Sequence, residues 1–107
     1  MEMINKIELT GIVGRVNITA LGDATVARLS LATDYAYKSH DDYAVIDTTW
    51  FSVTAWDGPK TRDILNLHKG TKIHLIGRMR MRHIVDVDGC ERQSWEVVAN
   101  ELQIIED

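Results

Sequence analysis

Cysteine, proline and long apolar runs are scarce in this chain of 107 residues. Its one cysteine, Cys90, has no partner for an intrachain disulfide, which fits a reducing compartment such as the cytoplasm. No apolar run approaches the ~20 residues that a membrane-spanning helix needs, and the first residues lack the apolar stretch of a secretory signal. The histidines show no metal-ligand spacing with Cys90. We therefore expect a cytoplasmic protein without a membrane anchor, a disulfide or a metal.

Motifs for catalysis and cofactor binding are missing as well. No serine lies in a nucleophile motif, and the glycines of segment 11–14 are not followed by the Lys-Ser/Thr of a phosphate loop. Segment 86–89 lacks the later acidic ligands of a calcium loop. We expect a protein that is not an enzyme and needs no cofactor. The composition, 45% apolar and 26% charged, predicts one globular domain over residues 1–107.

Charge is unevenly distributed along the chain. The net charge of −4 argues at first sight against a nucleic-acid partner. However, residues 60–82 contain seven basic residues and one acid, whereas residues 83–107 contain seven acids and one base. Because local fields bind ligands, a basic stripe on one element can serve an acidic chain.

Alternating apolar residues predict strands over most of the chain. The expected strands are Ile4–Val13, Thr25–Thr33, Asp47–Trp56, Thr71–Ile84 and Gln93–Ala99, with Leu102–Ile105 closing the domain. Gly11 and Gly14 suggest a bend or bulge in the first strand. Residues 34–46 are polar and are expected to form a loop. A helix of about three turns is expected between Pro59, which suits a first turn, and Gly70, which suits a stop.

The order of these elements predicts the fold class. Three strands, a short helix and two more strands are typical of the oligonucleotide-binding barrel (OB fold). An SH3-like barrel would lack the helix, and a sandwich would need more strands. We therefore expect an all-β protein, a five-stranded OB-fold barrel with one short helix between strands three and four.

The third expected strand carries two tryptophans on the face that should be wet. Successive strand side chains point to opposite faces, so Phe51, Val53 and Ala55 form an ordinary core face. The opposite face carries two indoles flanking two small hydroxyls: Trp50, Ser52, Thr54 and Trp56. Such a platform can stack nucleobases, at roughly 1–3 kcal/mol per base. The alternative is that a second layer, such as a helix or a partner subunit, buries both indoles.

Arginines alternate with methionines along the fourth expected strand. Arg78, Arg80 and Arg82 therefore project from one face. Arginine is the side chain best suited to phosphate forks and to stacking on bases, so phosphate contact is predicted. The alternative is a solubilising strand face that protects a sheet edge.

Six segments in order resemble the bacterial single-stranded DNA-binding protein family. They are 5–11 (NKIELTG), 29–33 (LSLAT), 49–50 (TW), 69–71 (KGT), 77–82 (GRMRMR) and 96–102 (EVVANEL). The resemblance spans nearly the whole chain. It implies an OB fold, usually as a homotetramer, that wraps single-stranded DNA with little sequence preference during replication, recombination and repair.

The resemblance also implies roles for particular residues. Trp50 and Trp56 match two stacking positions of the family, and Tyr37 matches a third that is often Trp. A further family tryptophan is replaced here by Ile84, and Trp95 on the returning strand is a candidate to compensate for it. Phosphate contacts are expected of Arg78, Arg80 and Arg82, with Lys60, Arg62 and Lys72 as weaker candidates.

Three departures from the family keep an alternative open. Phe51 replaces a His that often supports subunit contacts, so a dimer is possible in place of the tetramer. Family members usually continue into a linker and an acidic tail that recruits other proteins, whereas this chain stops at Asp107, so tail-mediated recruitment is not expected of it. Phe51, Ile84 and the net acidity together motivate the alternative, an SSB-like or primosomal-type OB assembly module that binds DNA weakly and uses its aromatic face for protein contacts. The fold alone does not distinguish RNA from DNA.

Overall fold

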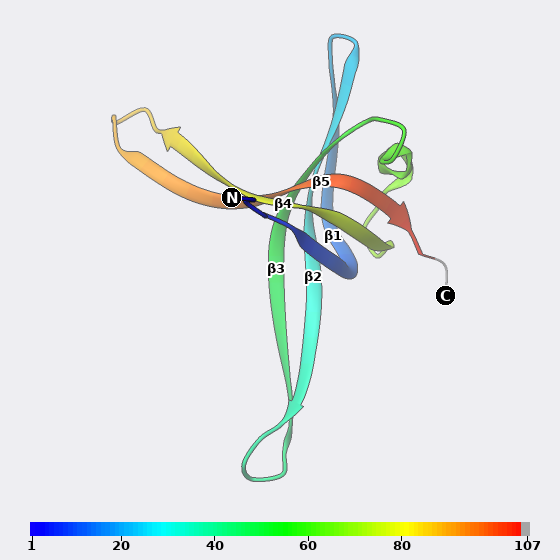
Figure 1. Ribbon diagram of the computed structural model, residues 1–107, viewed down its shortest axis with the longest axis vertical. Helices are drawn as coiled ribbons and strands as arrows, with labels where there is room; N and C mark the ends of the chain where they lie inside the picture. Colours follow the sequence, from blue (N-terminus) through cyan, green and yellow to red (C-terminus); the bar gives the residue numbers. More distant parts are fainter. Residues whose placement is uncertain (106–107) are drawn as a thin grey trace.

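The computed structural model describes residues 1–105, which form a closed barrel of five strands. The elements are β1 (Ile7–Leu21), β2 (Ala24–Lys38), β3 (Ala44–Trp56), η1 (Arg62–Asn66), β4 (Lys72–Val85) and β5 (Glu91–Ile104). The strand order around the barrel is β1-β2-β3-β5-β4, and only β3 and β5 pair in parallel among the described strands (Figure 1). The expected all-β, five-stranded barrel is confirmed.

Alternate residues of every strand fill the barrel. Its largest fully buried side chains are Val13, Val26, Leu31, Val53, Ile64, Ile73, Leu75 and Val97. Ile64 belongs to η1, which lies between β3 and β4 in the chain and closes one end of the core. The Asp63 carboxylate accepts a hydrogen bond from the Ile104 backbone N–H at 2.7 Å and so ties η1 to the end of β5. This core turns the remaining residues of each strand toward solvent.

The strands are longer than their sequence pattern predicts, and hairpin arms project from the barrel (Figure 1). Residues 34–38 and 44–46, expected in a loop, continue the ladder between β2 and β3. The Thr48 hydroxyl donates to the Asp34 carboxylate at 2.7 Å across this ladder. Polar side chains predicted a loop here, but both faces of a two-stranded arm are solvated, so polar residues and a regular ladder are compatible.

Two further predictions about elements were wrong in detail. The helix of about three turns is a five-residue 3-10 turn, because Leu67 already has extended backbone angles and packs into the core. The two segments expected after residue 93 are one strand, β5, with Asn100 left over where the register shifts opposite Ile76 and Gly77. Gly77 permits this close approach, since a Cβ there would lie 2.1 Å from the Val98 carbonyl oxygen.

A bulge in β1 was correctly predicted from its glycines. The register against β2 shifts between Val13 and Val16, so Gly14 and Arg15 lie in the irregular part of the strand. No helix within residues 1–105 is long and apolar enough to cross a membrane.

Candidate nucleic-acid interface

The two tryptophans of β3 lie on its outer face. Trp50 is 60% exposed and Trp56 is 44% exposed, whereas Val53 and Ala55 on the opposite face are fully buried. Within residues 1–105, therefore, no second layer covers the indoles. Thr54, which shares their face, is buried, because Glu96 of the neighbouring strand β5 lies against it. The platform thus has exposed aromatic ends, and of the two hydroxyl residues between them Ser52 is exposed and Thr54 is covered.

Contacts with β1 and β2 position the Trp50 indole. A Cβ on Gly14 would lie 2.5 Å from Cζ3 of the ring, so the indole occupies the space that a side chain at position 14 would fill. Ser30, next to the ring in β2, accepts a hydrogen bond from the Arg15 backbone N–H at 2.9 Å. Because Gly14 in the β1 bulge has no side chain, it leaves the space that the Trp50 indole occupies, and we call this space the seat of Trp50.

A shallow groove of about 470 Å³ lies beside this seat. Its polar walls include Arg15 and Asn17 of β1, Arg28 of β2 and Ser52 of β3. Arg28 lies opposite Thr54 in the β2–β3 register, between the two exposed indoles and nearer to Trp56 than to Trp50. Sequence reasoning did not single out either arginine, because it located the basic charge in residues 60–82. The available signal was that Arg28 alternates with the buried residues Ala27 and Leu29.

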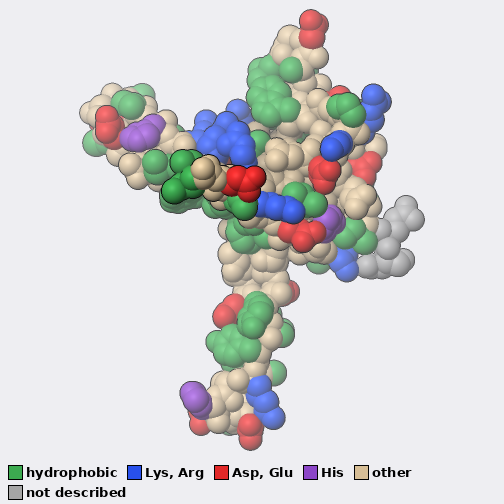
Figure 2. Space-filling view, viewed as in Figure 1, with side chains coloured by type: hydrophobic (Ala, Val, Ile, Leu, Met, Phe, Trp, Pro, Cys, Tyr) green, Lys and Arg blue, Asp and Glu red, His purple; other side chains and the backbone are tan. Residues whose placement is uncertain are grey.

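The predicted arginine row lies on one outer face of β4. Arg78, Arg80 and Arg82 stand opposite Val98, Glu96 and Ser94 of β5. Arg78 and Arg82 are exposed, whereas Arg80 is only partly so. Figure 2 shows Lys and Arg side chains gathered where the β4–β5 arm leaves the barrel. The structure thus brings the row to the surface as predicted.

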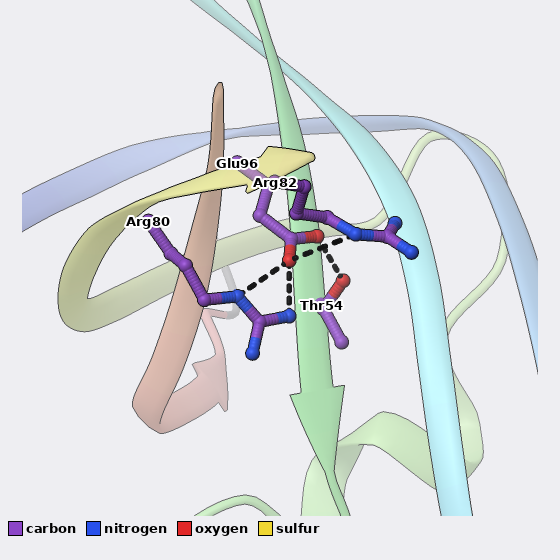
Figure 3. A network of polar contacts seen from close by, with 4 residues as sticks. All are labelled: Thr54, Arg80, Arg82 and Glu96. Carbon is purple, nitrogen blue, oxygen red and sulfur yellow. Dashed lines mark hydrogen bonds and ion pairs between the residues drawn. The ribbon is translucent and has the colours of Figure 1, made fainter. Parts of the chain in front are cut away.

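Glu96 occupies the middle of the arginine row, and sequence reasoning did not single it out. Its side chain is only 4% exposed. One carboxylate oxygen, Oε1, accepts hydrogen bonds from Arg80 Nε at 2.8 Å and from Arg80 Nη2, while Oε2 accepts one from the Thr54 hydroxyl at 2.8 Å (Figure 3). Arg82 Nε lies 3.7 Å from Oε1. Burial alone would raise the pKa of Glu96, but the bonds from Arg80 and Thr54 and the charges of both arginines outweigh it and hold the pKa below its ordinary 4.5.

The three weaker basic candidates lie nearer the η1 end of the barrel. Lys60 borders a hollow shared with Trp56 and forms an exposed ion pair with Glu101 at 3.4 Å. Arg62 begins η1, and Lys72 begins β4 opposite Ile12. Lys72 is six residues from Arg78, roughly 20 Å along an extended strand. Only Lys60 of the three adjoins one of the platform tryptophans.

The other predicted aromatic residues do not join the platform. Tyr37 lies in the β2–β3 arm, opposite Val45, and its ring centroid is 6.2 Å from that of Tyr35. Trp95 is 63% exposed but pairs with Met81, so it lies on the opposite face of the β4–β5 arm from Ile84. Strand alternation therefore separates Trp95 from the face that carries Ile84, so any stacking on Trp95 would take place on the other side of this arm.

Residues 1–105 show neither a metal-binding cluster nor an unpaired buried polar group. No group of three or more His, Cys, Asp or Glu side chains within residues 1–105 is arranged to hold a metal ion. Every buried side-chain nitrogen and oxygen in that part of the chain has a hydrogen-bond partner. The surface offers stacking rings, guanidinium groups and hydroxyls, which suit binding.

Sequence comparisons identify relatives over almost the whole chain. The sequence model of the single-strand binding protein family matches residues 4–105. The single-stranded DNA-binding protein of Neisseria meningitidis serogroup A is 32% identical over 95% of this chain and 60% of its own length. The one from Xanthomonas axonopodis pv. citri is 33% identical over 95% of this chain and 58% of its own length. The chain therefore spans about three fifths of the relatives it matches.

Solved structures share the fold. A chain of the Plasmodium falciparum SSB complex with ssDNA superposes with a TM-score of 0.82 at 25% identity, covering 99% of this chain and 98% of that one. A small single-stranded DNA-binding protein from Streptomyces coelicolor gives a TM-score of 0.72 at 23% identity, with 96% of each chain covered.

Proposed function

The chain belongs to the single-strand binding protein family, a family of non-enzymatic DNA-binding proteins, and on that premise we propose that it binds single-stranded DNA with little sequence preference. The observation that carries the proposal is the pair of exposed indoles on the outer face of β3, with a guanidinium between them. Exposed indoles are costly to leave in water unless a partner covers them, and every nucleobase has a face that can stack on them.

Bases would stack on Trp50 and Trp56, at roughly 1–3 kcal/mol per base. The two residues are six positions apart on β3, so the strand of DNA would run about 20 Å between them. Arg28, opposite Thr54 and nearer the Trp56 end of this path, and Arg15 at its edge would contact phosphates. Stacking and phosphate contacts read no base edges, which accounts for binding without sequence preference.

Phosphates would continue across the β4 row toward Arg78 and Arg82, with Lys60, Arg62 and Lys72 as peripheral contacts. Tyr37 is a candidate for a separate stacking site on the β2–β3 arm, beside Tyr35. The acidic residues of that arm and of the β4–β5 turn would keep the backbone of the DNA near the barrel. A chain with a net negative charge can bind DNA in this way, because binding depends on the electrostatic field near the contact surface and not on the net charge.

The direct test is to remove each platform indole and compare it with a matched control. Trp50→Ala and Trp56→Ala should each weaken binding to a labelled oligothymidine by roughly 1–3 kcal/mol, measured by fluorescence anisotropy. Trp95→Ala removes an indole of similar exposure from another face and should leave the affinity unchanged. Equal losses for all three variants would contradict the assignment of the platform.

Self-association is the second part of the proposal. By resemblance we expect a homotetramer, or a dimer, acting in the cytoplasm in replication, recombination and repair. The single exposed cysteine fits that reducing compartment. Sedimentation velocity over a range of protein concentrations should show a species larger than one chain. A monomer at every concentration would refute this part alone.

One observation favours the assembly module as a second candidate. Met81 and Trp95 form an exposed apolar pair on the face of the β4–β5 arm away from the arginines. Exposed apolar surface of this kind often marks a protein contact. Size measurements at several salt concentrations, with and without oligonucleotide, separate the candidates: a species that grows when oligonucleotide is added favours the DNA binder, and a species whose size does not change with oligonucleotide favours the module.

A further inference from the structure

We infer that Glu96 is a built-in counter-anion of the arginine row: it keeps Arg80 bound to the protein and so lowers the number of DNA phosphates that the row neutralises. This inference rests on the proposed function. It separates three arginines that look equivalent in the sequence into one that is internally bound and two that are available.

Two hydrogen bonds hold the Arg80 guanidinium against Glu96. Two of its guanidinium nitrogens, Nε and Nη2, donate to the same carboxylate oxygen. Turning Arg80 toward a phosphate would break both bonds and leave the Glu96 carboxylate, only 4% exposed, without its main partner. An unpaired buried charge is strongly unfavourable, so a phosphate in solvent should not displace Arg80.

Arg82 is held much more weakly. Its Nε is 3.7 Å from Oε1, beyond hydrogen-bonding distance, and the side chain is partly exposed. Glu96 cannot follow Arg82 outward, because the Thr54 hydroxyl of β3 holds its other oxygen at 2.8 Å. Arg82 can therefore turn to a phosphate while Arg80 and Thr54 keep the carboxylate paired.

Arg78 has no such competitor in the row. It stands opposite Val98, two positions along β5 from Glu96, and is exposed. The row thus carries three guanidinium charges and one fixed carboxylate at its centre. We expect it to neutralise two phosphates rather than three, and the carboxylate to repel any phosphate that passes over Arg80.

The experiment measures affinity for a labelled oligothymidine over a salt series. Each phosphate neutralised on a single strand adds about −0.7 to the log-log slope. Glu96→Gln keeps the shape and one acceptor oxygen for Arg80, but it removes the negative charge and so frees the charge of Arg80. Its slope should be steeper than that of the unmodified protein by about 0.7, which corresponds to about fivefold tighter binding at 0.1 M salt if the affinities meet at 1 M.

Two further variants make the result specific. Glu8→Gln removes the same charge from a carboxylate that pairs with His74 between β1 and β4, and it should leave the slope unchanged. The double variant Arg80→Gln/Glu96→Gln removes the internal pair together and should have the slope of the unmodified protein. The slope reports phosphate contacts, so a purely structural role of Glu96 would not move it in this pattern.

The outcomes that overturn the inference are distinct from those that overturn the proposed function. If the unmodified protein binds but the salt slope of Glu96→Gln is equal to or shallower than that of the unmodified protein, the inference that Glu96 acts as a counter-anion is wrong. The proposed DNA binding then still stands. If Glu96→Gln does not fold, the double variant decides: a slope shallower by about 0.7 would mean that Arg80 does contact a phosphate. If the unmodified protein does not bind at low salt, both proposals fall.

Discussion

Replacing Gly14 by alanine should weaken DNA binding although it substitutes no residue that is proposed to contact DNA. A Cβ at this position would lie 2.5 Å from Cζ3 and 2.9 Å from Cη2 of Trp50, whereas ordinary contact begins at 3.4 Å. The edge of the ring must therefore move by about 1 Å. Because the indole is 60% exposed, it can swing outward at little cost to the fold. The folded protein would then present Trp50 at a changed angle.

The loss of affinity caused by Gly14→Ala cannot exceed the free energy of the one base stack on Trp50. Losing one base stack costs roughly 1–3 kcal/mol, or about a fivefold to a hundredfold loss of affinity, and a displaced ring should lose part of that. Thermal stability should change little, since Gly→Ala also lowers the entropy of the unfolded chain by an amount worth about 0.4–1 kcal/mol. Anisotropy titration with oligothymidine and a thermal melt measure the two quantities separately.

A double-mutant cycle shows whether the effect passes through the indole. In a Trp50→Ala background, Gly14→Ala should have no further effect on affinity, because the ring that it displaces is gone. If Gly14→Ala binds as tightly as the unmodified protein, the seat of Trp50 does not control binding. If it weakens binding equally in both backgrounds, it acts on β1 and not on the ring.

Three other changes have defined outcomes. Arg28→Gln should make the log-log salt slope shallower by about 0.7, and an unchanged slope would remove Arg28 from the phosphate path. Ile84→Trp places an indole on the arginine face of β4 and should tighten binding to long oligothymidine by up to ~1–3 kcal/mol, whereas no gain would mean that DNA does not reach this arm. The lowered pKa of Glu96 implies stability that is present above pH 4.5 and lost as the pH falls through the lower folded-state value. The difference in unfolding free energy between the unmodified protein and Glu96→Gln should therefore shrink on acidification below pH 4.5, and a difference that is constant with pH would contradict it.

Strand alternation made the fold and the platform predictable. The period of two in segment 50–56 assigns Val53 and Ala55 to the core and both indoles to the outer face, and burial follows that pattern. The arginine row follows for the same reason. These features depend on residues close together in the sequence, which is where periodicity carries information.

The rest of the site depends on register between strands, which one sequence does not specify. Arg28 lies beside the platform, opposite Thr54, because β2 pairs with β3 in one particular register. Glu96 meets Thr54 because β5 crosses beside β3 in parallel, a contact between residues 42 positions apart. Trp95 misses the face of Ile84 because Met81 is its partner. Polar composition likewise concealed the extended β2–β3 arm.

The most direct measurement is intrinsic tryptophan fluorescence of a Trp95→Phe variant during titration with long oligothymidine at low and at high salt. Only Trp50 and Trp56 then report. We predict strong quenching at low salt that weakens as salt rises, because bases stack on these indoles while arginines hold the phosphates. A folded protein whose fluorescence does not change at low salt would contradict the central claim that the outer face of β3 binds single-stranded DNA.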